Sequence, residues 1–93
     1  MPQWSVYMLR CADDSLYTGV AIDVEVRVTK HNEGKASKYT RSKLPVELVY
    51  CEPAASHGDA LRREYAIKQL PVKLKQQLLS SAGNALHASS GSG

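Results

Sequence analysis

Residues 4–34, WSVYMLRCADDSLYTGVAIDVEVRVTKHNEG, decide the fold of this 93-residue chain. Two segments rich in Val, Tyr and Leu, 4–11 and 15–20, enclose the polar sequence ADDS. Apolar, β-prone segments on either side of such a turn predict a β-hairpin. Gly19 lies inside the second predicted strand, where a glycine indicates close approach by backbone or by a ligand.

The next segment, 24–33, carries two competing patterns. Its three valines alternate with polar residues, which favours a strand. The first and last of these valines also share a helical spacing with His31. Asp23 before the segment and Gly34 after it suit the two ends of a helix. The local pattern therefore leaves helix and strand open.

The rest of the chain predicts one more strand and two helices. Residues 35–45, KASKYTRSKLP, have the composition of a basic polar loop, and residues 46–52 that of a third strand. After a turn at 53–58, a helix is expected over 60–70. Pro71 is expected to open the following helix as its first residue.

Length and charge indicate one small, mildly basic domain. We expect this domain to span residues 1–79, because the Gly/Ser-rich composition that follows predicts a flexible tail over 80–93. The formal charge of +3 and the pI of about 9.0 permit nucleic-acid binding without demonstrating it.

Composition also predicts the cellular compartment. No apolar run approaches the roughly 18 residues that a membrane span needs. Residues 1–4 lack the basic-then-apolar pattern of a secretion signal. Cys11 and Cys51 lie far apart without a CxxC motif, so we expect free thiols rather than a disulfide framework. The sequence therefore predicts a cytoplasmic protein without a membrane partner.

Two short motifs on the predicted hairpin resemble the catalytic core of the GIY-YIG nuclease superfamily. Tyr7 matches the tyrosine of the first motif, Gly-Ile-Tyr, although Ser5 replaces its glycine. Tyr17 and Gly19 match the outer residues of the second motif, Tyr-Ile-Gly, with Thr18 between them. Each motif is weak alone, and their joint order and spacing are far more specific.

The resemblance extends to polar residues further along the chain. Arg27 matches the arginine of the family's helix, which favours helix over strand for 24–33. His31 matches the histidine or tyrosine one turn later, and Glu64 matches the family's metal-binding glutamate. Val20 stands where some members carry a lysine, so a mechanism that needs this lysine does not apply here.

What the resemblance implies is an α/β (α+β) domain with a three-stranded antiparallel sheet flanked by about three helices. The small stand-alone bacterial proteins of this superfamily are similar to the nuclease domains of excision-repair nucleases and of structure-specific endonucleases. The implied activity is metal-dependent endonucleolytic hydrolysis of phosphodiester bonds, in DNA rather than RNA. Substrate choice would then come from the domain itself, from a homo-oligomer or from a partner protein.

The implied catalytic residues are Tyr7, Tyr17, Arg27, His31 and Glu64. Mg²⁺ or Mn²⁺ would bind at Glu64, since Mg²⁺ often takes one or two carboxylates together with waters and phosphate oxygens. Arg27 suits phosphate oxygens. Tyr17 is the candidate general base with Tyr7 positioning it or the water, and His31 is the alternative base.

A second group of residues is expected to contact nucleic acid: Gly19, Lys35, Lys38, Tyr39 and Arg41. Their cations would hold backbone phosphates while Tyr39 stacks on a base or sugar. A solvated basic loop explains the residues around Tyr39 without a function. Likewise, Tyr7 and Tyr17 could be ordinary sheet-face aromatics. The alternatives to an enzyme are a nucleic-acid-binding module that does not cut, and a protein-interaction scaffold.

Overall fold

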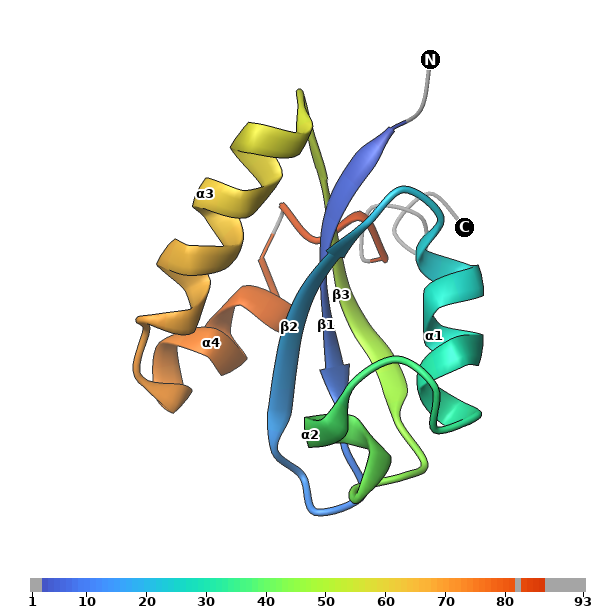
Figure 1. The fold of residues 1–93 in the computed structure, drawn as a ribbon. Coiled ribbons are helices and arrows are strands. Elements are labelled where there is room, and N and C mark those ends of the chain that lie inside the picture. The colour runs from blue at the N-terminus through green and yellow to red at the C-terminus, as the bar shows by residue number, and fades with distance from the viewer. Residues whose placement is uncertain (1–2, 82, 87–93) are drawn as a thin grey trace.

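The computed structural model describes residues 3–81 and 83–86. Within them, an antiparallel sheet of three strands in the order β2-β1-β3 lies between helices (Figure 1). The strands are β1 (Trp4–Arg10), β2 (Leu16–Ala21) and β3 (Glu47–Ala54), and the helices are α1 (Val24–Asn32), α2 (Lys38–Arg41), α3 (His57–Lys68) and α4 (Val72–Leu79). The predicted α/β (α+β) class, with a three-stranded antiparallel sheet flanked by helices, is confirmed.

The predicted hairpin forms around a tight polar turn. Asp14 takes a left-handed conformation with φ of 68°, which short polar side chains tolerate better than most. The carboxylate of Asp13 accepts hydrogen bonds from the backbone N–H of Ser15 at 3.0 Å and from its hydroxyl at 2.6 Å. The register that follows pairs Tyr7 with Gly19 across the two strands.

The segment with two patterns is a helix, α1, and its ends explain why. Asp23 accepts a hydrogen bond from the backbone N–H of Val26 at 3.1 Å. Gly34 follows the helix with φ of +76°, a conformation that glycine adopts without strain. Val24 and Val28 pack toward the sheet. The caps and this packing therefore outweigh the alternation of the valines.

Several boundaries differ from those expected. The helix expected over 60–70 is α3, His57–Lys68, because Ser56 caps it three residues earlier, and Pro71 is the N-cap of α4 instead of its first residue. The loop expected over 35–45 contains the short helix α2, because the side chain of Ser37 accepts a hydrogen bond from the backbone N–H of Tyr39 and caps it. The third strand continues to Ala54 instead of ending at residue 52. Pro53 is tolerated there because β3 is an edge strand.

The sheet has an apolar core on each face. Val6, Met8 and Tyr50 pack with Ala60 and Ile67 of α3 on one face. The other face carries Tyr7, Leu9, Cys11, Ala21 and Val46, against which the partly buried Tyr17, Val24, Val28, Leu44 and Leu48 pack. In Figure 1, α3 and α4 lie on one side of the strands and α1 on the other. The two motif tyrosines therefore lie on the α1 side.

The packed structure continues beyond the boundary expected at residue 79. Asn84 is buried, and its side-chain oxygen accepts a hydrogen bond from the backbone N–H of Cys51 at 3.2 Å. Its amide nitrogen donates to the carbonyl oxygens of Val49 and Leu79, at 3.1 and 3.0 Å. Part of the expected tail is thus attached to β3. Residue 82 and residues 87–93 lie outside the described part.

The structure also shows the state of the two cysteines and the lengths of the helices. Cys11 is buried, Cys51 is partly buried, and both are free. No helix in 3–81 or 83–86 is long and apolar enough to cross a bilayer.

Candidate active site

A buried chain of hydrogen bonds joins the first motif to α1 and α2. The hydroxyl of Tyr7 lies 2.8 Å from Nε2 of His31, and Nδ1 of His31 lies 2.8 Å from the hydroxyl of Thr40. Thr40 donates its own proton to the carbonyl oxygen of Ser37, at 3.3 Å. The hydroxyl of Thr40 therefore accepts from Nδ1–H of His31, and Nε2 accepts from Tyr7.

The electrostatics of this chain agree with its hydrogen bonding. Burial and the nearby Arg27 charge both lower the pKa of His31, which favours the neutral imidazole. The pKa of Tyr7 is raised to about 12, mainly by burial and next by the nearby Tyr17. Arg27 opposes this increase by hydrogen bonding and by charge, and Glu64 adds to it. Tyr7 is thus a protonated donor to a neutral acceptor near neutral pH.

The two predicted charged residues act on Tyr7 from different helices. Arg27 lies in α1, one turn before His31, and is partly buried. Glu64 lies in α3, with its side chain 19% exposed. Both charges affect the pKa of the Tyr7 hydroxyl. Tyr7, Tyr17 and His31 are thus in contact, Arg27 hydrogen-bonds to Tyr7, and Glu64 is near enough for its charge to affect the pKa of Tyr7.

Gly19 makes room for the Tyr7 phenol. A Cβ atom at position 19 would lie 2.7 Å from both Cζ and Oη of Tyr7. The two residues face each other across the hairpin, so the ring lies directly over the glycine. The close approach expected at Gly19 is thus made by a side chain of the same protein, and nucleic-acid contact at this residue stays a prediction.

We expect Gly19→Ala to destabilise the protein by about 1–3 kcal/mol, the usual cost of overpacking a core. A loss of stability would be informative, because replacing glycine by alanine within a strand normally stabilises a protein. Gly58→Ala is the control, because the nearest atom to a Cβ there is 3.6 Å away. Urea unfolding of the two variants measures the difference. Equal stability of both variants would contradict this account of Gly19.

An aromatic cluster extends the site toward α2. The ring of Tyr17 meets the ring of His31 edge-on, with centroids 5.1 Å apart. It also stacks loosely on Tyr39 at 5.9 Å. Lys43 lies 4.9 Å from the centroid of the Tyr39 ring and forms a salt bridge of 2.5 Å with Asp13. Tyr39 is thereby fixed next to Tyr17, and Lys43 supports it.

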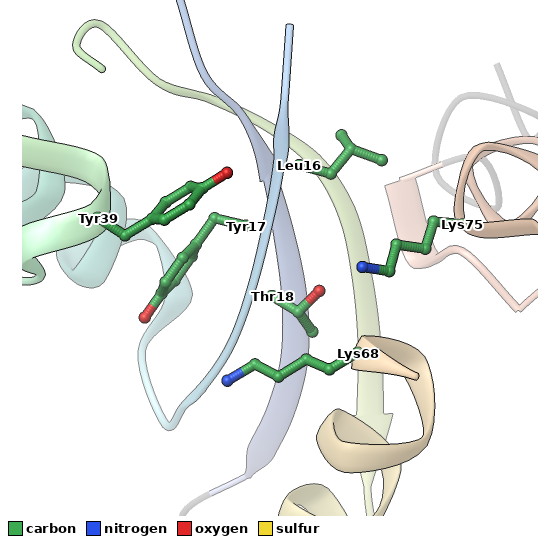
Figure 2. Close-up of a pocket in the computed structure, with 6 residues that line it drawn as sticks. All are labelled: Leu16, Tyr17, Thr18, Tyr39, Lys68 and Lys75. Carbon is green, nitrogen blue, oxygen red and sulfur yellow. The ribbon is translucent and has the colours of Figure 1, made fainter. Parts of the chain in front are cut away.

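A pocket of about 410 Å³ crosses the edge of β2 beside this cluster (Figure 2). Tyr17 and Tyr39 lie on one side of the strand, and Lys68 and Lys75 lie on the other. The complete lining is Leu16, Tyr17, Thr18, Tyr39, Lys68 and Lys75. Of the residues predicted to bind nucleic acid, Tyr39 lines this pocket.

The three predicted basic residues near α2 do not line it. Lys35, Lys38 and Arg41 are exposed. Lys35 lies 4.0 Å from the carboxylate of Glu33, and the side chain of Arg41 lies near Gly34. A role for these three cations in nucleic-acid binding stays a prediction.

Comparison with known proteins decides the family. A model of the GIY-YIG catalytic domain matches residues 3–76. The chain belongs to the GIY-YIG family. A UPF0213 protein of Desulfotalea psychrophila is 43% identical over 88 residues, which cover 94% of this chain and 80% of that protein. A UPF0213 protein of Staphylococcus epidermidis is 48% identical over 79 residues, which cover 85% of this chain and 96% of that protein.

Two solved structures resemble this GIY-YIG domain. The solution NMR structure of a UPF0213 protein from Bacillus halodurans has a TM-score of 0.57 at 43% identity, covering 87% of this chain and 86% of that one. The solution NMR structure of a protein from E. faecalis has a TM-score of 0.59 at 35% identity, and the match covers 86% of this chain and 85% of that one. The recognition made from the sequence is confirmed, and membership of this nuclease family implies a nucleic-acid substrate.

One carboxylate is available for the divalent metal that GIY-YIG nucleases generally use. Among the described residues, no group of three or more His, Cys, Asp or Glu side chains is arranged to hold a metal ion. Glu64 nevertheless fits Mg²⁺, which often takes one or two carboxylates and completes its shell with waters and substrate phosphate. Its carboxylate lies 3.3 Å from the ammonium of Lys68, a half-exposed partner that a cation can displace.

Sequence reasoning missed three residues of this GIY-YIG site. Thr40 lies in a helix that the loop composition concealed, and Lys75 belongs to a helix far along the chain. Lys68 carried a signal, its spacing of one turn from Glu64, which by itself indicates only an ion pair. The pairing is present, and Lys68 also lines the pocket.

We expect Thr40→Val to cost about 1–3 kcal/mol of stability, because it leaves the buried Nδ1–H of His31 without an acceptor. Thr40→Ser restores the hydroxyl and should recover most of this loss. Urea unfolding measures the cost, and the ¹⁵N shifts of the imidazole report the tautomer. A valine variant with unchanged stability and unchanged imidazole shifts would refute the role of Thr40.

Proposed function

We propose that this protein is a divalent-metal-dependent endonuclease that hydrolyses phosphodiester bonds, in DNA rather than RNA. The observation that carries the proposal is the donor–acceptor pair of Tyr7 and neutral His31, with one cation and one carboxylate acting on the same hydroxyl. A buried tyrosine hydroxyl usually has a hydrogen-bond partner, and here the partner is an imidazole that can accept its proton. Family membership supplies the substrate class.

Tyr7 and His31 together supply the general base. With its pKa raised to about 12, Tyr7 is almost never a phenolate near neutral pH. It can still accept the proton of an attacking water if its own proton passes to Nε2 of His31 in the same step. The sequence-based assignment made Tyr17 the base and left His31 as the alternative. The hydrogen bond between Tyr7 and His31 supports His31 as the final acceptor, with Tyr7 as the relay.

The remaining residues position and neutralise the phosphodiester. Arg27 hydrogen-bonds to Tyr7 and has no salt bridge with an acidic side chain in the described part of the chain, so the remaining N–H groups of its planar guanidinium are available for phosphate oxygens. Tyr17 packs against the imidazole and holds its orientation. Glu64 would hold Mg²⁺ or Mn²⁺, which when bound supplies Lewis-acid activation of the phosphate and neutralises the leaving oxygen.

The decisive experiment is incubation of the protein with duplex, nicked, branched and single-stranded DNA and with RNA. Each substrate is tested with Mg²⁺, with Mn²⁺ and with a chelator. Internal cuts in at least one substrate, seen only with metal, support the proposal. Salt-dependent binding without cutting of any substrate would replace it with a binding module. Absence of any salt-dependent nucleic-acid binding would leave a scaffold.

A further inference from the structure

The pocket that crosses β2 lies immediately beside the candidate active site. Tyr17 belongs to both, since it contacts the ring of His31 and also lines the pocket. Lys68 connects them on the other side of the strand, because it lines the pocket and pairs with Glu64 at 3.3 Å. A ligand bound in the pocket would therefore lie next to the phosphodiester in the candidate active site.

We propose that this pocket holds the nucleotide adjacent to the cleaved phosphodiester, with its phosphate on Lys75 and Lys68. This inference rests on the proposed function and names the part of the substrate that the site recognises. It also makes α4 a part of the nucleic-acid interface, in addition to the basic residues near α2 that the sequence indicated.

Charge argues for an anionic ligand. Two of the six lining residues are lysines, and none of the six is acidic. Lys75 forms no salt bridge with an acidic side chain among the residues that the structure describes. Figure 2 shows the side chains of Lys68 and Lys75 extending toward β2 from their helices. Two such ammonium groups suit phosphate oxygens, to which lysine binds as a point charge.

The opposite wall argues for a nucleotide rather than a free phosphate. Tyr39 is 43% exposed although Tyr17 and Lys43 hold its ring in place. Its hydroxyl is directed toward Leu16 in Figure 2, on the pocket side of α2. A fixed ring with a polar end can contact both a sugar or base and its polar atoms. The volume of about 410 Å³ lies within the range of small-ligand pockets.

A second hollow continues the pocket away from the active site. It measures about 200 Å³ and shares Leu16, Tyr39 and Lys75 with the first. Asp14 lines this second hollow, and an acidic side chain there disfavours a further phosphate. Lys75 lines both hollows and has no acidic partner among the described residues, which makes it the lysine to test.

The test is equilibrium binding without metal, so that no cleavage occurs. A short fluorescein-labelled DNA is titrated with the protein at several salt concentrations, once as a single strand and once as a duplex. For Lys75→Ala we expect weaker binding in at least one form and a salt-dependence slope smaller by about 1, the signature of one lost phosphate contact. Lys73→Ala is the matched control, because Lys73 lies in the same helix but is exposed and outside the pocket.

Tyr39→Phe tests the other wall. Loss of its hydroxyl should weaken binding about two- to tenfold, the equivalent of one hydrogen bond, and leave the salt slope unchanged. Thermal unfolding verifies that the variants remain folded. Equal effects of Lys75→Ala and Lys73→Ala would overturn the pocket assignment, since they would reflect general charge alone.

The two proposals fail separately. If the wild type cuts DNA while Lys75→Ala binds with an unchanged slope, the pocket assignment falls and the nuclease stands. If the wild type cuts nothing while Lys75→Ala still lowers the slope, the nuclease falls and the pocket remains a nucleotide site.

Discussion

Glu64→Gln is expected to bind DNA as the wild type does and to cut it roughly a thousandfold more slowly or worse. Metal stabilisation of transition-state charge is worth several kcal/mol, and each ~1.4 kcal/mol changes a rate tenfold. Glutamine keeps the shape of the side chain in α3 and removes the charge that can hold a cation. The rate of cleavage at saturating Mg²⁺ measures the effect.

A binding measurement makes this prediction specific to the metal. Mn²⁺ relaxes water protons strongly when it is bound to protein, so titration of the free protein reports the site without any substrate. We expect the wild type to bind Mn²⁺ and Glu64→Gln to lose most of this affinity. Glu25→Gln removes the same charge from an exposed position in α1 and serves as the control. Equal cleavage by the wild type and Glu64→Gln would remove Glu64 from the site.

Loss of the ion pair with Lys68 cannot by itself imitate this result. The pair joins a half-exposed ammonium to a carboxylate one turn away, and such pairs typically contribute about 0.3–0.5 kcal/mol. A stability change of that size leaves the fraction of folded protein almost unaltered. The fall in rate therefore reports on the carboxylate at the site and not on the fold.

The fold was predictable wherever its determinants are local. The turn at Asp13 and Asp14 and the helix caps at Asp23 and Gly34 act through side chains only a few residues away. Such features can be read from a short stretch of sequence. The helix α2 was missed because four residues are too few to show a helical period.

The roles within the site were less predictable, since they depend on which elements pack together. The sequence shows Tyr7 and Tyr17 as two phenols in similar motifs and predicts Tyr17 as the base. Only the packing of α1 against the sheet brings His31 within hydrogen-bond distance of Tyr7 and sets the same imidazole edge-on to the ring of Tyr17. The family resemblance identified the residues, and the three-dimensional contacts distinguish their surroundings.

Tyr7→Phe is expected to lower the cleavage rate by roughly 10²–10⁴-fold, the usual contribution of a positioned acid–base group. Phenylalanine keeps the ring that packs over Gly19 and removes the hydroxyl that donates to His31. Nε2 of His31 then lacks its donor, and no relay links the attacking water to the imidazole. DNA binding should change little, because phenylalanine keeps the ring over Gly19 and removes no charge from the site.

Tyr50 provides a close control for this substitution. Tyr7 and Tyr50 are both buried in the sheet, and burial raises the pKa of each to about 12. The hydroxyl of Tyr50 donates to Glu52 at 2.5 Å on the face packed against α3, away from His31. Both Tyr→Phe variants should therefore lose a similar stability, about 1–3 kcal/mol, since one leaves a buried imidazole nitrogen without its donor and the other removes a hydrogen bond to a carboxylate.

Their cleavage rates should differ, because only one of the two hydroxyls can move a proton in the site. If Tyr50→Phe keeps the wild-type rate while Tyr7→Phe loses it, the loss belongs to the relay and not to the sheet. If the two variants have equal rates at equal stability, the general base is His31 acting without Tyr7, or Tyr17. In that case the hydrogen bond between Tyr7 and His31 would serve only to join α1 to β1.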